Sequence, residues 1–265
     1  MPALAFGLLA AAPIDRSFIV IPLTGAIAIL ACTAIGFAVY SLVPGLKDLP
    51  GPSFGVIMIA AAYGNVTFLG LPVITELFGQ GKGHVAILFD LLSHTPLMLT
   101  LGAFIAARYG SGGEVSVAGS IKRVIMLPPL WGVAAGIAVR LGGVPVPSVI
   151  LDTASIMGRA VIPLMTFTVG LALDFSEIKR MPAAVPALAI KLLLAPVIAW
   201  WAGSWLGLTG DTLKAVAVEG SMPVMVVSLV LADEFKLDIP LAAACIAVST
   251  VALFFTMPVM MRLLF

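Results

Sequence analysis

Charged residues are scarce in this sequence. Only 10% of its 265 residues are Asp, Glu, Lys or Arg, whereas 61% are hydrophobic. A soluble domain has about 25% charged residues and about 45–50% apolar ones. A folded chain of this composition has too few polar groups to cover a surface in water. The shortage of charge therefore excludes an ordinary soluble domain and indicates an integral membrane protein.

Cysteine, histidine and net charge are low as well. Cys32 and Cys245 both lie in apolar runs, which favours small core residues over a disulfide or a metal site. The two histidines, His84 and His94, form no metal-binding motif. The net charge of +1 does not indicate a nucleic-acid partner. We therefore expect no cofactor, no metal site and no nucleic acid.

Long hydrophobic runs predict an all-α protein with about nine helices. Several runs reach the roughly 20 residues needed to cross about 30 Å of hydrocarbon. The first run is too short to cross, and it lacks the positively charged start of a cleavable signal. The predicted helices span about 1–12, 18–43, 54–78, 84–109, 128–141, 149–173, 184–206, 212–232 and 241–265.

Parts of the sequence repeat with a period of five helices. MPALAFGL at 1–8 resembles IPLMTFTV at 162–169, and a glycine break at 64 has a counterpart at 220. An odd period inverts the second copy in the membrane, and inverted repeats with interrupted helices are typical of transporters. We expect a first repeat at 1–109 that lacks its first helix, a linker at 110–127 and a second repeat at 128–265. A small excess of Lys and Arg in the loops on the linker's side predicts that the linker is cytoplasmic.

Several short motifs resemble those of the auxin efflux carrier family, which includes bacterial relatives of the plant PIN carriers. The motifs cover nearly the whole chain. They are GNVTFLGLP at 64–72, LFG at 77–79, ILFD at 87–90, PL and VGLAL within 163–173, AVEGSMP at 217–223, LADEF at 231–235, ST at 249–250 and MP at 257–258.

This resemblance implies a bile-acid-symporter-like fold of two inverted five-helix repeats, whose two broken helices cross near the middle of the membrane. It further implies transport of a small carboxylate, such as malate, malonate or an auxin-like acid, across a bacterial plasma membrane, often by a homodimer. Sodium coupling stays open, with Ser221, Ser249 and Thr250 as candidate ligands. In the family fold the first helix belongs to the scaffold and dimer side, so its absence here bears on the oligomeric state more than on the site.

The two helix breaks are the predicted substrate site. Broken helices leave backbone amides unpaired, which the membrane tolerates only inside protein or around a cavity, and such amides attract carboxylates. The side-chain amide of Asn65 adds a further donor. The alternative is a pair of kinked packing helices. The predicted substrate-binding residues are Gly64, Asn65, Val66, Thr67, Gly220, Ser221, Met222 and Pro223.

Three titratable residues near the breaks are candidates for ion coupling. Glu219 precedes the second break, where a carboxylate must face a cavity or carry a proton. Asp90 and His94 are four residues apart, which places them on one face of an α-helix as a proton relay. The alternatives are a structural cap for Glu219 and a local hydrogen bond between Asp90 and His94. The coupling ion is therefore H⁺ or Na⁺.

Three further charges are interpreted as structural. Arg159 and Asp152 are two turns apart on one helix face and are expected to pair, with attraction of the anion by Arg159 as the alternative. Lys191 is expected to extend along its helix to the cytoplasmic surface, with a counter-ion role as the alternative.

Three rival functions remain. The first is an intramembrane enzyme, because GPSFG at 51–55 matches a nucleophile elbow and is followed in the chain by Asp90 and His94. A nucleophile elbow, however, needs a strand-to-helix turn. A ligand-binding membrane sensor and a channel are the others. The sequence favours a non-enzymatic secondary carrier of a small organic anion that works by alternating access.

Overall fold

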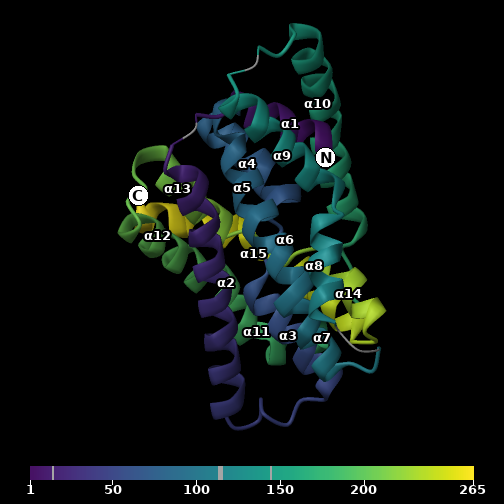
Figure 1. The fold of residues 1–265 in the computed structure, drawn as a ribbon. Helices are drawn as coiled ribbons and strands as arrows, with labels where there is room; N and C mark the ends of the chain where they lie inside the picture. The colour runs from purple at the N-terminus through teal and green to yellow at the C-terminus, as the bar shows by residue number, and fades with distance from the viewer. Residues whose placement is uncertain (14, 113–115, 144) are drawn as a thin grey trace.

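The computed structural model describes residues 1–13, 15–112, 116–143 and 145–265, and the regular secondary structure in this part of the chain is helical apart from one isolated β-bridge (Figure 1). The predicted all-α class is confirmed. The α-helices are α1 (Pro2–Ala11), α2 (Ser17–Leu42), α3 (Gly51–Ala62), α4 (Leu71–Phe78), α5 (Gly83–Phe89), α6 (Thr95–Leu97), α7 (Ala103–Tyr109), α8 (Val117–Ile125), α9 (Pro128–Leu141), α10 (Ser148–Leu171), α11 (Met181–Ala189), α12 (Ala195–Trp205), α13 (Gly210–Gly220), α14 (Ser228–Glu234) and α15 (Ile239–Leu264).

Four continuous helical stretches among the described residues are long and apolar enough to cross a membrane. They are Ser17–Leu42, Gln80–Tyr109, Ile178–Trp205 and Ile239–Leu264. A fifth span forms if α8 and α9, which meet at 58°, are taken together. The predicted linker, residues 110–127, therefore contains helix α8, and α9 follows it after a bend. Pro128 and Pro129 lie at this bend and lack the amide N–H groups that would continue a straight helix.

π-helical turns interrupt two of these spans, Gln80–Tyr109 and Ile178–Trp205, and a further π turn precedes α4. They comprise Val66–Gly70 before α4, Asp90–His94 after α5, Met98–Gly102 before α7 and Ile190–Leu194 between α11 and α12. A π turn bonds residue i to residue i+5 instead of i+4, so it shifts the direction of every side chain that follows. Side-chain directions predicted from 3.6 residues per turn are therefore accurate only up to the first π turn of a helix.

Two helices are broken, at the predicted places, and their breaks lie against each other. α3 ends at Ala62, α13 ends at Gly220, and an antiparallel bridge joins Gly64 to Val224. The Asn65 amide donates to the Pro223 carbonyl at 2.7 Å, and the Met225 amide donates to the Tyr63 carbonyl at 3.1 Å. Each break thus provides hydrogen-bond partners for backbone amides and carbonyls that are unpaired within the other break. The interior of a membrane protein requires such pairing.

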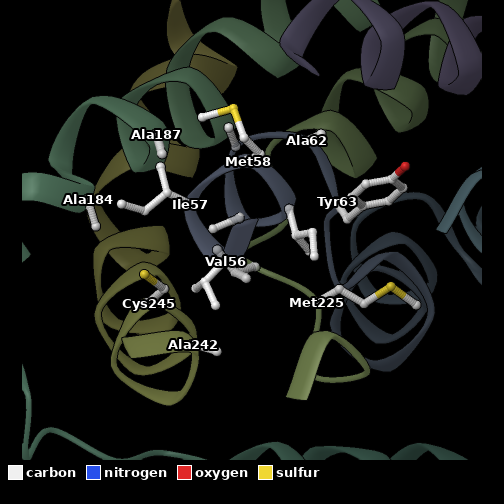
Figure 2. Packing of buried hydrophobic residues seen from close by; sticks show 14 of the residues in the cluster. Val56, Ile57, Met58, Ala62, Tyr63, Ala184, Ala187, Met225, Ala242 and Cys245 are labelled. Atoms are coloured by element: carbon white, nitrogen blue, oxygen red, sulfur yellow. The ribbon is translucent and has the colours of Figure 1, made fainter. Parts of the chain in front are cut away.

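Small residues pack α3 between α11 and α15. Figure 2 shows Ile57 beside Ala184 and Ala187 of α11, and Val56 on the side of Ala242 and Cys245 of α15. Small side chains let membrane helices approach closely, where dispersion forces hold them together. This packing positions the end of α3, and with it the first break.

Helices α1, α9 and α10 form a separate layer, with α10 along one edge of the molecule (Figure 1). A side-chain carbon added at Gly136 of α9 would lie 2.9 Å from the Phe6 carbonyl oxygen of α1. The glycine therefore permits direct contact between the two backbones. The division of the chain into inverted repeats at 1–109 and 128–265 stays a prediction.

Candidate functional site

All eight predicted substrate-binding residues are buried, and Gly64 and Asn65 of the first break contact Met222 and Pro223 of the second. Two of the expected donors are already occupied. The Ser221 amide donates to the carbonyls of Ala217 and Val218, and the Met222 amide donates to the Glu219 carbonyl at 3.2 Å. The expectation of free amides at Ser221 and Met222 is therefore wrong, because α13 closes its own last turn. Any donors for a ligand must come mainly from side chains.

Asn65 supplies such a donor. The residue is 3% exposed, and its Nδ2 atom has no hydrogen-bond partner among the described residues. A buried amide without a partner costs about 1–3 kcal/mol on mutational scales, so native structures seldom keep one without a reason. A bound anion would satisfy it.

Asp90 and His94 do not pair with each other. The hydroxyls of Thr67 and Thr95 donate to the two carboxylate oxygens of Asp90, the second at 2.7 Å. The His94 Nδ1 atom has no partner among the described residues, and the His94 ring packs 5.0 Å from the Phe89 ring. The predicted relay is wrong because residues 90–94 form a π turn, which aligns Asp90 with Thr95 instead of His94.

Glu219 is fully buried at the end of α13. Neither of its carboxylate oxygens has a hydrogen-bond partner among the described residues. A side-chain carbon added at Gly70 would lie 2.1 Å from Oε2 of Glu219. The carboxyl group therefore packs directly on the π turn of the other broken helix.

Lys191 does not reach the surface, contrary to our prediction. It is 1% exposed, and its Nζ atom donates to the Gly220 carbonyl at 2.5 Å. The broken end of α13 offers this lysine an acceptor inside the protein, and no sequence spacing indicated that contact. Lys191 joins the crossing as a residue that sequence analysis placed elsewhere.

The remaining predicted residues are the Arg159–Asp152 pair and the candidate sodium ligands Ser221, Ser249 and Thr250. Asp152 is exposed on α10, and the side chain of Arg159 lies outside the described residues, so their pairing stays a prediction. The hydroxyls of Ser221 and Thr250 donate to carbonyls of their own helices, and Ser249 Oγ accepts the Val224 amide at 3.0 Å. Within the described ranges, no three His, Cys, Asp or Glu residues are grouped to hold a metal.

The segment that matched a nucleophile elbow opens a helix. Ser53 lies in the first turn of α3, and its Oγ donates to Oδ2 of Asp238 at 2.7 Å. The strand that an elbow requires does not precede it, because residues 43–50 form a turn and loop.

Two broken helices that cross inside a bundle of apolar spans, with unpaired polar groups at the crossing, define a membrane transporter. The sequence model of the membrane transport protein family matches residues 1–261, and the chain belongs to this family. Membership confirms the resemblance to the auxin efflux carriers and supports a non-enzymatic role.

Three relatives are transporters by name. The chain is 32% identical to an uncharacterized transporter of Methanothermobacter thermautotrophicus over 78% of this chain and 67% of the relative. It is 29% identical to an uncharacterized transporter of Methanocaldococcus jannaschii over 83% and 72%. It is 24% identical to a protein of Rhizobium meliloti named "Putative malonate transporter" over 94% and 79%.

Proposed function

We propose that this protein is a secondary transporter that carries a small carboxylate anion across the membrane by alternating access. The observation that carries the proposal is the unpaired, buried Nδ2 of Asn65 at the crossing of the two broken helices. Asn65 is the only asparagine in the chain. A carboxylate oxygen is the acceptor that this donor lacks.

The charge at the crossing supports an anionic substrate. The Lys191 ammonium lies beside the first break, since a side-chain carbon added at Gly64 would be 3.0 Å from its Nζ atom. An ammonium group in a low-dielectric interior attracts an anion more strongly than in water. The name of the Rhizobium meliloti relative agrees with a dicarboxylate, although its identity is only 24%.

Membrane placement and assembly are also part of the proposal. The protein resides in the plasma membrane as a homodimer, and the segment that includes Ser111 faces the cytoplasm. Ser111 and Asp211 are exposed near opposite ends of the broken helix α13–α14. An impermeant thiol reagent should therefore label Ser111→Cys only from inside and Asp211→Cys only from outside, and the reverse pattern would overturn the orientation. Light scattering of the purified protein tests the dimer.

Uptake into proteoliposomes tests the function. Labelled malonate, malate and indole-3-acetate are offered to the native protein, to Asn65→Ala and to Thr75→Ala. Thr75 is a buried polar residue of the same broken helix, but its hydroxyl donates to the Leu71 carbonyl of that helix at 2.9 Å. We expect saturable uptake that falls at least about tenfold in Asn65→Ala, the loss of roughly 1.4 kcal/mol of anion binding, and is retained in Thr75→Ala.

Two other outcomes would count against the proposal. Full uptake by Asn65→Ala would retain the transporter and refute the site. Saturable binding of an acid by the native protein without any uptake would favour a sensor.

A further inference from the structure

Helix α8 is amphipathic and leaves its apolar face uncovered. Val117, Ile121 and Ile125 follow one another at intervals of four residues, so they share one face of the helix. They are 73%, 49% and 55% exposed, whereas Ser120, at the edge of this face, is buried. A row of exposed aliphatic side chains at helical spacing indicates a surface that contacts something other than water.

The opposite face of α8 is polar and is held by the tip of the second broken helix. Arg123 forms an ion pair with Glu234 at the end of α14, at 2.8 Å between Nη1 and Oε1, and Figure 1 shows the two helices beside each other. Gly119, Arg123 and Glu234 line a cavity of about 330 Å³. The Ser111 amide, ahead of α8, donates to the Phe235 carbonyl at 3.0 Å. These contacts determine how α8 is rotated, and they turn its apolar face away from α14.

The charges of α8 are positive. Residues 116–127 contain Lys122 and Arg123 but no Asp or Glu. Lys122 is exposed, follows Ile121 directly and forms no ion pair among the described residues. A lysine at the border of an apolar face can cover apolar surface with its methylene groups while its ammonium reaches a phosphate. Positive charge beside exposed apolar side chains is complementary to an anionic lipid surface.

The direction of α8 also suits a membrane surface. The helix has nine residues, which is too short to cross the hydrocarbon. The apolar helix α9 follows it, and the two axes differ by 58°. Two adjacent cations inside the hydrocarbon would be costly, whereas at the level of the headgroups they are favourable. A short, charged helix that turns away from the next span therefore fits the headgroup layer.

We propose that α8 is an interfacial helix whose apolar face binds the surface of a bilayer that contains anionic lipids. Val117, Ile121 and Ile125 enter the boundary between headgroups and acyl chains, and Lys122 binds lipid phosphates. Through Arg123, the same helix ties the tip of α14 to the membrane surface. The proposal goes beyond the proposed function, because the position of α8 can be measured without any substrate.

Lipid quenching of a fluorescent label tests the depth of α8. A dye is attached to Ile121→Cys or to Gly119→Cys in the full chain, which is reconstituted at low density in vesicles of phosphatidylcholine and phosphatidylglycerol. Gly119→Cys is the matched control on the polar face, and the buried Cys32 and Cys245 give a low background. A spin label near the lipid headgroup should quench the Ile121 position at least about twofold more than the Gly119 position. A spin label near the chain end should quench the Ile121 position less.

The same dye measures the preference for anionic lipid. Spin-labelled phosphatidylglycerol should quench the Ile121 position at least about twofold more than spin-labelled phosphatidylcholine at equal concentration, because Lys122 attracts the anionic headgroup. Adding Lys122→Gln should remove most of this difference. Lys47→Gln is the control, since Lys47 is an exposed lysine in the loop between α2 and α3, and it should retain the difference.

Four results would overturn the proposal. A dye at the Ile121 position that no lipid quencher reaches would place the apolar face in water. Strongest quenching from the chain end would make α8 the first half of a bent span with α9. Disulfide-linked dimers of Ile121→Cys would mean that a second copy of the chain covers the face. Equal quenching by the two lipids would refute the role of Lys122. Val117→Cys, on the same face, provides the same readouts if Ile121→Cys does not fold.

Discussion

At the scale of single residues, Gly70 and Glu219 determine how closely the two broken helices approach. Gly70 ends the π turn of the first broken helix, and the Glu219 carboxyl occupies the space where any larger residue would place its side chain. The contact joins residues 149 positions apart, from 70 to 219. The Glu219 carboxyl group can point towards the first broken helix because Gly70 has no side chain there.

The first prediction concerns Gly70→Ala. The added carbon would lie 2.1 Å from Oε2 of Glu219 and 2.7 Å from its Cδ atom, so the carboxyl group must move within a packed interior. Overpacking of this kind costs about 1–3 kcal/mol. We expect a lower Tm and reduced uptake. Gly170→Ala is the control, because nothing lies within 4 Å of the added carbon in α10. Equal effects of the two substitutions would contradict the role of Gly70.

At the scale of elements, one polar cluster joins three helix starts at one end of the molecule. Asp238 precedes α15 and caps it, since its Oδ1 accepts the Leu241 amide at 3.2 Å. The carboxylate also accepts from Ser53 in α3 at 2.7 Å and from the guanidinium of Arg180, just before α11. These bonds hold the first turns of α3, α11 and α15 together.

The second prediction follows from the charge of Asp238. Burial raises the pKa of this carboxyl, but hydrogen bonds from Arg180 and Ser53 outweigh burial, and the pKa lies below its usual value. The ionised form is therefore bound better in the folded state. The stabilisation is fully present above the usual pKa of about 3.9 and is lost as the pH falls through the lower pKa of the folded state.

Asp238→Asn should accordingly reduce stability at neutral pH by about 1–2 kcal/mol, a figure kept low because Arg180 is partly exposed and screened by solvent. The Tm difference from the native protein should shrink as the pH is lowered towards about 3. Thermal melts across this pH range, with the exposed Asp48→Asn as the control, measure it. A pH-independent difference would show that the charge of Asp238 is unimportant.

At the scale of the whole molecule, the layer of α1, α9 and α10 packs mainly within itself. Its contacts with the rest of the molecule include Leu8 of α1 against Gly83 of α5, where an added carbon would lie 3.1 Å from the leucine. Within the layer, an added carbon at Gly7 would lie 3.5 Å from Cβ of Ala154 in α10. Alternating access predicts movement between the layer and the rest, with little movement inside the layer.

The third prediction compares two cross-links. A disulfide between Gly7→Cys and Ala154→Cys is geometrically allowed, since linked Cβ atoms lie about 3.5–4.5 Å apart. It should leave uptake within about twofold of the reduced protein, because it stays inside one layer. Leu8→Cys and Gly83→Cys joined by mercury or a short bifunctional reagent should abolish uptake. The native Cys32 and Cys245 are buried and serve as a low background. Unimpaired uptake after the second cross-link would contradict relative movement at this contact.

The sequence by itself determined the membrane class, the position of every long helix to within a few residues, both helix breaks and the family. These features follow from composition, from apolar run lengths and from Gly and Pro, which act locally through backbone geometry and water exclusion. Gly64 and Asn65 of the first break contact Met222 and Pro223 of the second, as a crossing of the two breaks requires.

Only the tertiary structure decided which polar groups at the crossing are paired. The π turn at 90–94 aligned Asp90 with Thr95, against the spacing of an ordinary helix. Lys191 lies inside the protein, where its ammonium donates to the Gly220 carbonyl at the end of α13. Gly70 of the opposite break packs against Glu219. The physical reason is that each of these contacts joins the end of one helix to a residue far away in the chain or depends on a change of helical register. Neither is encoded in the local periodicity from which helices are predicted.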